Sequence, residues 1–153
     1  MLVSVLLVLH ILFTAIWVGG MVFAFMVLRP AVDQQPPENK LTILAAIFKR
    51  FFVYVWHAVV LMPLTGYALL MMLHNGFAGA GIHLHIMQTL WLVMTAVFLT
   101  MFFGPYKPFK KAVADEDWPT AAKHLPKIRA LIFTNLILGI LTIVIGSGGR
   151  YWV

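Results

Sequence analysis

The chain has 153 residues, of which 62% are hydrophobic and 10% charged, and its formal net charge is +6. An average soluble domain has roughly 25% charged residues, so this composition and a mean hydropathy of +0.95 exclude a soluble globular domain. The chain has no cysteine, which excludes disulfides, iron–sulfur clusters and thiolate metal sites.

The first uncharged stretch, at about 2–28, is long enough to cross a membrane, because about 20 residues rising 1.5 Å each span a hydrocarbon core of about 30 Å. His10 lies roughly 12 Å along it and needs a polar partner or a ligand within the bundle. Thr14 and Trp17 follow on the same helical face, and Gly20 beside that face permits close approach of a neighbouring helix or a flat ligand.

The next uncharged block, at 51–106, is too long for one span, and a Gly-rich stretch at 74–81 divides it. We therefore predict membrane spans at about 49–73 and about 82–105. A proline inside the first of these, Pro63, is tolerated because neighbouring helices can satisfy the carbonyl that it frees.

Two further histidines lie within these spans. His85 opens the span at 82–105 and is expected in the same half of the membrane as His10. His57 lies roughly 10–12 Å into the span at 49–73, so it could approach the level of His10 from the other side. Each histidine has a structural alternative, in which it is hydrogen-bonded inside the bundle or lies at the membrane interface.

A fourth span, at about 130–148, places both termini on one side of the membrane. All but one of the eleven basic residues flank the first and third connections, and the exception is Arg150. By the positive-inside rule those connections are cytoplasmic and both termini face outward, toward the periplasm. The third connection, at 107–129, is either a solvated linker or carries a short amphipathic helix that starts at Trp118.

The excess of basic residues is thus explained by the membrane topology, because these residues flank the predicted cytoplasmic connections. We therefore expect the lipid bilayer, and no nucleic acid, as a partner. The predicted fold class is an all-α integral membrane protein, a bundle of four transmembrane helices that forms a single domain over 1–153. No carboxylate, lysine or arginine lies within a predicted span, which argues against a proton pump or paired-carboxylate catalysis.

Several short motifs are distributed over nearly the whole chain: Leu9-His10, Ala15–Met21, Arg29-Pro30, His85–Gln88, Phe103–Tyr106, Asn135–Gly139 and Gly149–Tyr151. Together they resemble the CopD-like superfamily of bacterial membrane proteins. The resemblance implies a four-helix bundle in the bacterial cytoplasmic (inner) membrane, and larger members are associated with copper uptake or resistance. The first-helix pattern is also similar to HemJ-type protoporphyrinogen oxidases, which bind haem b. Those proteins pair this histidine with a lysine on the third helix, where this chain has no lysine.

From this resemblance and from membrane depth we predict one haem b with His10 and His85 as its metal ligands. A haem with two histidine ligands is coordinatively saturated, which favours electron transfer over oxygen activation. The protein would then exchange electrons with a quinone or another membrane redox protein, as an oxidoreductase or as an electron carrier, and a homodimer is one way to enclose the porphyrin. The remaining cofactor-binding candidates are His57 as the alternative ligand, Trp17 and Gly20 in the pocket wall, and Arg150 beside a propionate.

Two other functions fit the same residues. In copper transport, His10 and His85 would act with membrane methionines such as Met21 and Met87, since thioether and imidazole ligands suit Cu(I). In a structural or assembly subunit, the histidines would only form hydrogen bonds within the bundle and would bind no ligand. The sequence has no tight Met-x-x-Met cluster that would support copper binding. Methionine is also a common filler of apolar cores, which is the structural alternative for these residues.

Overall fold

The computed structural model describes residues 1–151, without the side chain of Arg150. Four long helical segments cross the length of the bundle, and each is apolar enough to span a membrane. The described residues form no strand. The main helices are α1 (Leu2–Phe23), α3 (Pro37–His74), α4 (Ile82–Met101) and α6 (Trp118–Gly148), and the shorter ones are α2 (Arg29–Val32) and α5 (Lys107–Ala114).

Each predicted span lies within one of these segments, so the all-α, four-span fold class is confirmed. The helices are longer than the spans, and the connections at 33–36 and 115–117 are shorter than expected. In particular, the third connection is not a linker or a separate surface helix. α6 begins at Trp118, where Asp117 accepts a hydrogen bond from the backbone N–H of Thr120 at 3.1 Å, and it continues without a break into the fourth span.

Two π-helical segments continue the membrane helices past prolines instead of ending them. One, at Ala24–Leu28, precedes Pro30, and the other, at Phe102–Tyr106, contains Pro105. Proline lacks the N–H and its ring collides with the carbonyl four residues earlier. A local widening to the π spacing relieves that collision, so the helix continues through Arg29-Pro30 to Val32, beyond the predicted span at about 2–28.

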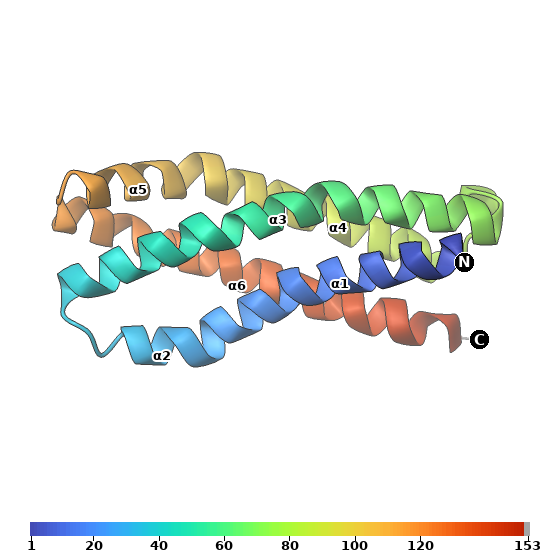
Figure 1. Cartoon of the computed structure of the whole chain (residues 1–153), viewed down its shortest axis with the longest axis horizontal. Helices are drawn as coiled ribbons and strands as arrows, with labels where there is room; N and C mark the ends of the chain where they lie inside the picture. Colours follow the sequence, from blue (N-terminus) through green and yellow to red (C-terminus); the bar gives the residue numbers. More distant parts are fainter. Residues whose placement is uncertain (152–153) are drawn as a thin grey trace.

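Both described ends of the chain lie at one end of the bundle, together with the connection between α3 and α4 (Figure 1). We call this the termini end, and the opposite end, which carries the connections at 33–36 and 115–117, the connector end. The shared position of the termini agrees with an even number of spans, whereas the side of the membrane that each end faces stays a prediction.

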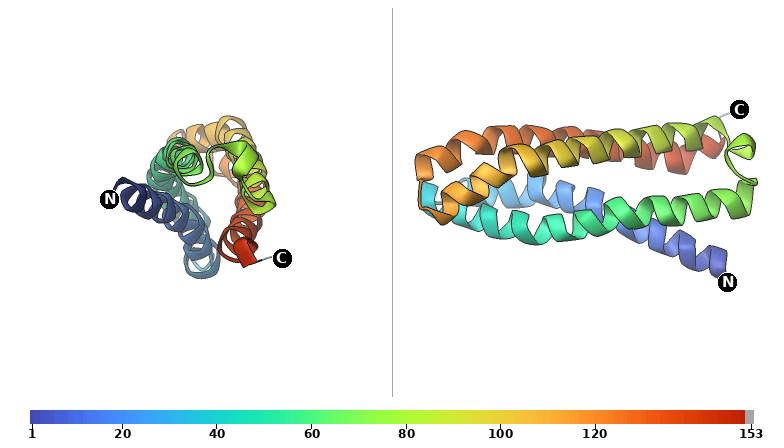
Figure 2. Two further views of the ribbon diagram at one scale, coloured as in Figure 1. Left: turned by 90° about the vertical axis from the view of Figure 1, so that its right-hand side faces the viewer. Right: turned by 90° about the horizontal axis from the view of Figure 1, so that it is seen from above.

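The bundle consists of two helical hairpins. α1 packs mainly against α3, and α4 packs mainly against α6. The four helices surround a central axis when the bundle is viewed from its end (Figure 2). The backbones of α3 and α4 approach each other less closely than those of the two hairpins, so side chains must fill the space between them.

At the middle of the bundle, aromatic side chains fill this space. Phe98 is only 1% exposed and lies at the centre of the group. Its ring centroid is 5.3 Å from that of Trp56, 5.7 Å from Phe52, 5.7 Å from Phe102 and 6.4 Å from Trp17. We call these five residues the aromatic layer. Three of the four contacts of Phe98 are edge-to-face, the arrangement that aromatic quadrupoles favour, and the rings close the bundle interior at this depth.

Candidate functional site

A cavity of about 290 Å³ opens between the helices at the termini end. Its volume is close to the lower limit of the roughly 300–1,000 Å³ that is typical of small-molecule sites. All four long helices contribute to the lining, which is apolar apart from a few polar side chains. The lining residues that bear on its chemistry are His10, Met62, Gly66, His74, Met87, Gln88, Trp91, Thr142 and Gly146.

His10 enters this cavity from α1 with its ring orientation set by α3. Its Nδ1 lies 3.1 Å from the carbonyl oxygen of Met62 and 3.0 Å from the hydroxyl oxygen of Thr65. The hydroxyl of Thr65 itself donates to the carbonyl of Leu61 at 2.7 Å, so its oxygen accepts from His10. A carbonyl oxygen can only accept, and therefore Nδ1 carries the hydrogen.

This hydrogen-bond pattern determines what the other ring nitrogen of His10 can do. In a neutral imidazole whose Nδ1 is protonated, Nε2 carries a lone pair. A backbone carbonyl that accepts from one ring nitrogen is the usual arrangement around a metal-ligating histidine, since it sets both tautomer and orientation. Gly66 makes room for the ring, because a Cβ at that position would lie 3.1 Å from His10 Cε1.

Two thioethers line the same cavity. Met62, one turn before Gly66 on α3, is 8% exposed, and its carbonyl is the partner of His10. Met87 on α4 rests directly on Gly146 of α6, where a Cβ would lie 3.0 Å from its sulfur and 2.8 Å from its methyl carbon. The glycine thus lets the thioether lie at the interface between α4 and α6.

A small chamber of about 10 Å³ lies deeper in the bundle and shares Met62, Trp91 and Thr142 with the cavity. Met94 also lines it, and the hydroxyl of Thr142 lies 3.9 Å from the Met94 sulfur. The chamber is about large enough for a single water molecule. The buried indole N–H of Trp91 has no hydrogen-bond partner among the described residues, so a polar guest at this depth would have a donor available.

The two histidines of the predicted ligand pair differ in their relation to the cavity. His10 lines the cavity, whereas His85 is not among the lining residues and its ring is 6.2 Å from that of Phe77. His57 is exposed on α3, and its Nδ1 donates to the carbonyl of Val53 at 2.7 Å. Neither His85 nor His57 is among the residues that line the cavity, and the roles predicted for them stay predictions.

The other predicted pocket residues have packing positions. Trp17 is 2% exposed and belongs to the aromatic layer, although it also borders the small chamber. Gly20 allows α1 to approach α3, because a Cβ there would collide with the ring of Phe51. The side chain of Arg150 lies outside the described part of the chain, so its proposed contact with a propionate stays a prediction.

Sequence reasoning named Met21 and Met87 as candidate copper ligands, but it missed how the methionines are arranged in this interior. Met87, Met94 and Met101 recur at intervals of seven residues on α4, which places them on one helical face. Met94 and Met101 are 4% and 3% exposed, so this face is turned into the bundle. A search for Met-x-x-Met does not detect this spacing, and no local signal places Met62 opposite it.

The donor set of the cavity suits a soft, singly charged metal ion. Thioether sulfur and neutral imidazole nitrogen are ligands that select Cu(I). Among the described residues no group of three or more His, Asp or Glu side chains could hold a metal. A haem with two histidine ligands would require two histidines that face each other, and of the predicted pair only His10 lines the cavity.

Four membrane-spanning helices around a cavity with imidazole and thioether donors define a multi-pass membrane protein with a candidate soft-metal site. Residues 45–148 match the family of Copper resistance protein D, CopD. The match covers more than half of the chain, and the protein therefore belongs to this family. It includes most of α3 and all of α4 to α6, while His10 lies outside it. No curated protein and no solved structure is significantly similar to the chain.

Proposed function

We propose that this protein handles copper in the membrane by binding Cu(I) in the cavity at the termini end. The observation that carries the proposal is the imidazole of His10. Its Nδ1 is held by the carbonyl of Met62, and the residue lines a cavity that Met62 and Met87 also line. Membership of the copper resistance protein D family supports the choice of metal.

The apolar lining fits a monovalent soft ion better than a hard one. Burying an ion without polar partners is costly, and the cavity has no carboxylate to compensate a doubly charged cation. Thioethers and imidazole compensate Cu(I) through coordination instead of charge pairing. The aromatic layer below the cavity means that the ion enters and leaves at the termini end in this conformation.

A competition titration tests the proposal. The purified protein would be titrated in detergent under reducing conditions against a chromophoric Cu(I) chelator. We expect His10→Ala to weaken Cu(I) binding at least about 100-fold, because even loss of a residue that supports a metal ligand costs about 10–100-fold. Met87→Leu keeps the side-chain volume and removes the sulfur, so it should weaken binding about tenfold or more.

Matched variants outside the cavity serve as controls. His85→Ala removes a histidine that does not line the cavity, and Met26→Leu removes a sulfur on a residue that is 72% exposed. Both should bind Cu(I) as the wild type does. Equal affinity of His10→Ala and the wild type would overturn the proposal. So would a strong Soret band with stoichiometric iron that disappears in both His10→Ala and His85→Ala, because that result identifies the predicted haem protein.

A further inference from the structure

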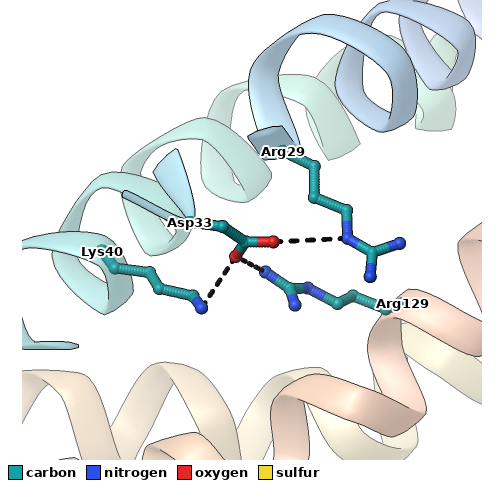
Figure 3. Close-up of polar contacts among 4 residues, drawn as sticks. All are labelled: Arg29, Asp33, Lys40 and Arg129. Carbon is teal, nitrogen blue, oxygen red and sulfur yellow. Dashed lines mark hydrogen bonds and ion pairs between the residues drawn. The ribbon is translucent and has the colours of Figure 1, made fainter. Parts of the chain in front are cut away.

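The connector end carries a compact group of charges that the proposed function does not use. Asp33, just after α2, is surrounded by three cationic side chains from different parts of the chain (Figure 3). Lys40 Nζ and Arg129 Nη2 each lie 2.7 Å from Asp33 Oδ1, and Arg29 Nε lies 3.5 Å from Oδ2. We call these four residues the Asp33 cluster.

The Asp33 cluster keeps an excess of positive charge after its ion pairs are formed. Three cations and one carboxylate leave a net charge of +2, and all four side chains are between 23% and 43% exposed. Arg29 is the most exposed of them, and the terminal nitrogens of its guanidinium point away from Asp33 (Figure 3). These N–H groups are therefore available to a second anion.

Aromatic side chains lie next to the cluster on the side of the membrane interior. The guanidinium carbon of Arg29 is 5.1 Å from the ring centroid of Phe25, and the ring of Phe25 is 5.1 Å from that of Phe133. Phe133 lies one helical turn from Arg129 on α6, toward the middle of the span, and it is 46% exposed. An apolar surface and a cationic surface thus adjoin at the depth where a lipid changes from chain to headgroup.

We infer that the Asp33 cluster, with Phe25 and Phe133, is a binding site for an anionic phospholipid. The phosphate would contact the free N–H groups of Arg29 and the exposed edges of Lys40 and Arg129, and the acyl chain would lie along the two rings. A guanidinium offers several donors in a planar arrangement that matches phosphate oxygens. Basic clusters beside transmembrane helices commonly bind anionic headgroups in this way.

An anionic lipid explains this arrangement better than a free phosphate ion does. A soluble anion would gain nothing from Phe25 and Phe133, whereas a lipid brings apolar chains to the same place. One carboxylate already occupies the centre of the cluster, so the remaining charge suits the single negative charge of a phosphodiester. The inference is independent of the copper site at the other end of the bundle.

Binding of phosphatidylglycerol and phosphatidylcholine to the full-length protein, measured by native mass spectrometry from a mild detergent, tests the inference. The wild type should prefer phosphatidylglycerol. Arg29→Gln should weaken that binding about fivefold, because one basic residue near a membrane surface contributes about 1 kcal/mol. Asp33→Asn removes the competing carboxylate and should strengthen binding by a similar factor.

The control is Lys123→Gln, which removes the same charge from an exposed residue of α6 at the connector end, outside the cluster. It should change the binding of phosphatidylglycerol by less than about twofold, because screening weakens distant charges. Equal losses in Arg29→Gln and Lys123→Gln would overturn the inference in favour of diffuse attraction. Weaker binding in Asp33→Asn, or displacement of the lipid by inorganic phosphate, would overturn it as well.

Discussion

The middle of the bundle and its termini end fill the space between α3 and α4 in opposite ways. In the middle the aromatic layer fills it, with the ring of Phe52 5.7 Å from that of Phe98. At the termini end the corresponding positions are glycines and flexible side chains, such as Gly66 and Met87, and a cavity of about 290 Å³ remains. Protein interiors are normally packed as densely as organic crystals. The difference therefore indicates that the middle of the bundle provides stability and the termini end provides room for a ligand.

The largest effect that this comparison predicts is the loss of a ring from the aromatic layer. Phe98→Ala should lower the free energy of unfolding by about 3–5 kcal/mol, because the four neighbouring rings cannot collapse into the space. Unfolding in detergent, followed by circular dichroism, measures the change.

Two variants serve as references for Phe98→Ala. Phe23→Ala removes the same ring from a residue that is 56% exposed and should cost less than about 1 kcal/mol. Leu84→Ala enlarges a cavity that already exists and should also cost about 1 kcal/mol or less. If Leu84→Ala destabilised the protein as strongly as Phe98→Ala, the division into a stabilising middle and a binding end would be wrong.

A smaller effect concerns the two adjacent glycines of α1. Gly20→Ala should destabilise the protein by about 1–3 kcal/mol, because the added methyl group collides with the ring of Phe51 and α1 must move away from α3. Gly19→Ala is the matched control, since nothing lies within 4 Å of a Cβ at that position. It should be neutral or slightly stabilising, because alanine favours the helix over glycine. Thermal unfolding of both variants would show whether close packing of α1 on α3 is confined to the predicted face.

The smallest effect is the acid sensitivity of the connector end. Hydrogen bonds from Lys40 and Arg129 lower the pKa of Asp33 from 3.8 to about 2. A carboxylate with a depressed pKa in the folded state contributes stability above its ordinary pKa, and this contribution is lost as the pH falls toward 2. Because the ion pairs are partly exposed, we expect it to be below about 1 kcal/mol.

Unfolding measured between about pH 5 and pH 2 checks this acid sensitivity, with Asp33→Asn as the comparison. The wild type should lose its advantage over Asp33→Asn in that range. Asp115→Asn, a change in an acidic residue without an ion pair in the described part of the chain, should follow the wild type. A constant difference between the wild type and Asp33→Asn at every pH would contradict the assignment.

Much of the fold could be predicted from local features. The uncharged stretches predicted the four spans, and the Gly-rich segment at 74–81 predicted the connection between α3 and α4, where Asn75 and Gly76 adopt positive φ. The helix ends were less predictable. At Pro30 and Pro105 the helices continue by way of π-helical segments, which the uncharged stretches alone do not indicate.

The candidate site was predictable in part. His10 could be identified because a histidine in an uncharged span requires a partner, and it does line the cavity. Its partners, the carbonyl of Met62 and the hydroxyl of Thr65, are 52 and 55 residues away, so no local pattern reveals them. His85 shares the expected membrane depth with His10, but the rotation of α4 turns its ring toward Phe77.

Composition and the order of charges were thus sufficient to establish a four-span helical membrane protein with one unusual histidine. The reason is that the hydrophobicity of a span and the positive charge beside it are properties of the local sequence and do not depend on contacts with other helices. The location of the cavity, the identity of its sulfur donors and the convergence of three cations on Asp33 depended on the tertiary structure. The physical reason is helix rotation and register. A change of about 100° per residue decides which side chains meet, and only packing against the other helices selects that rotation.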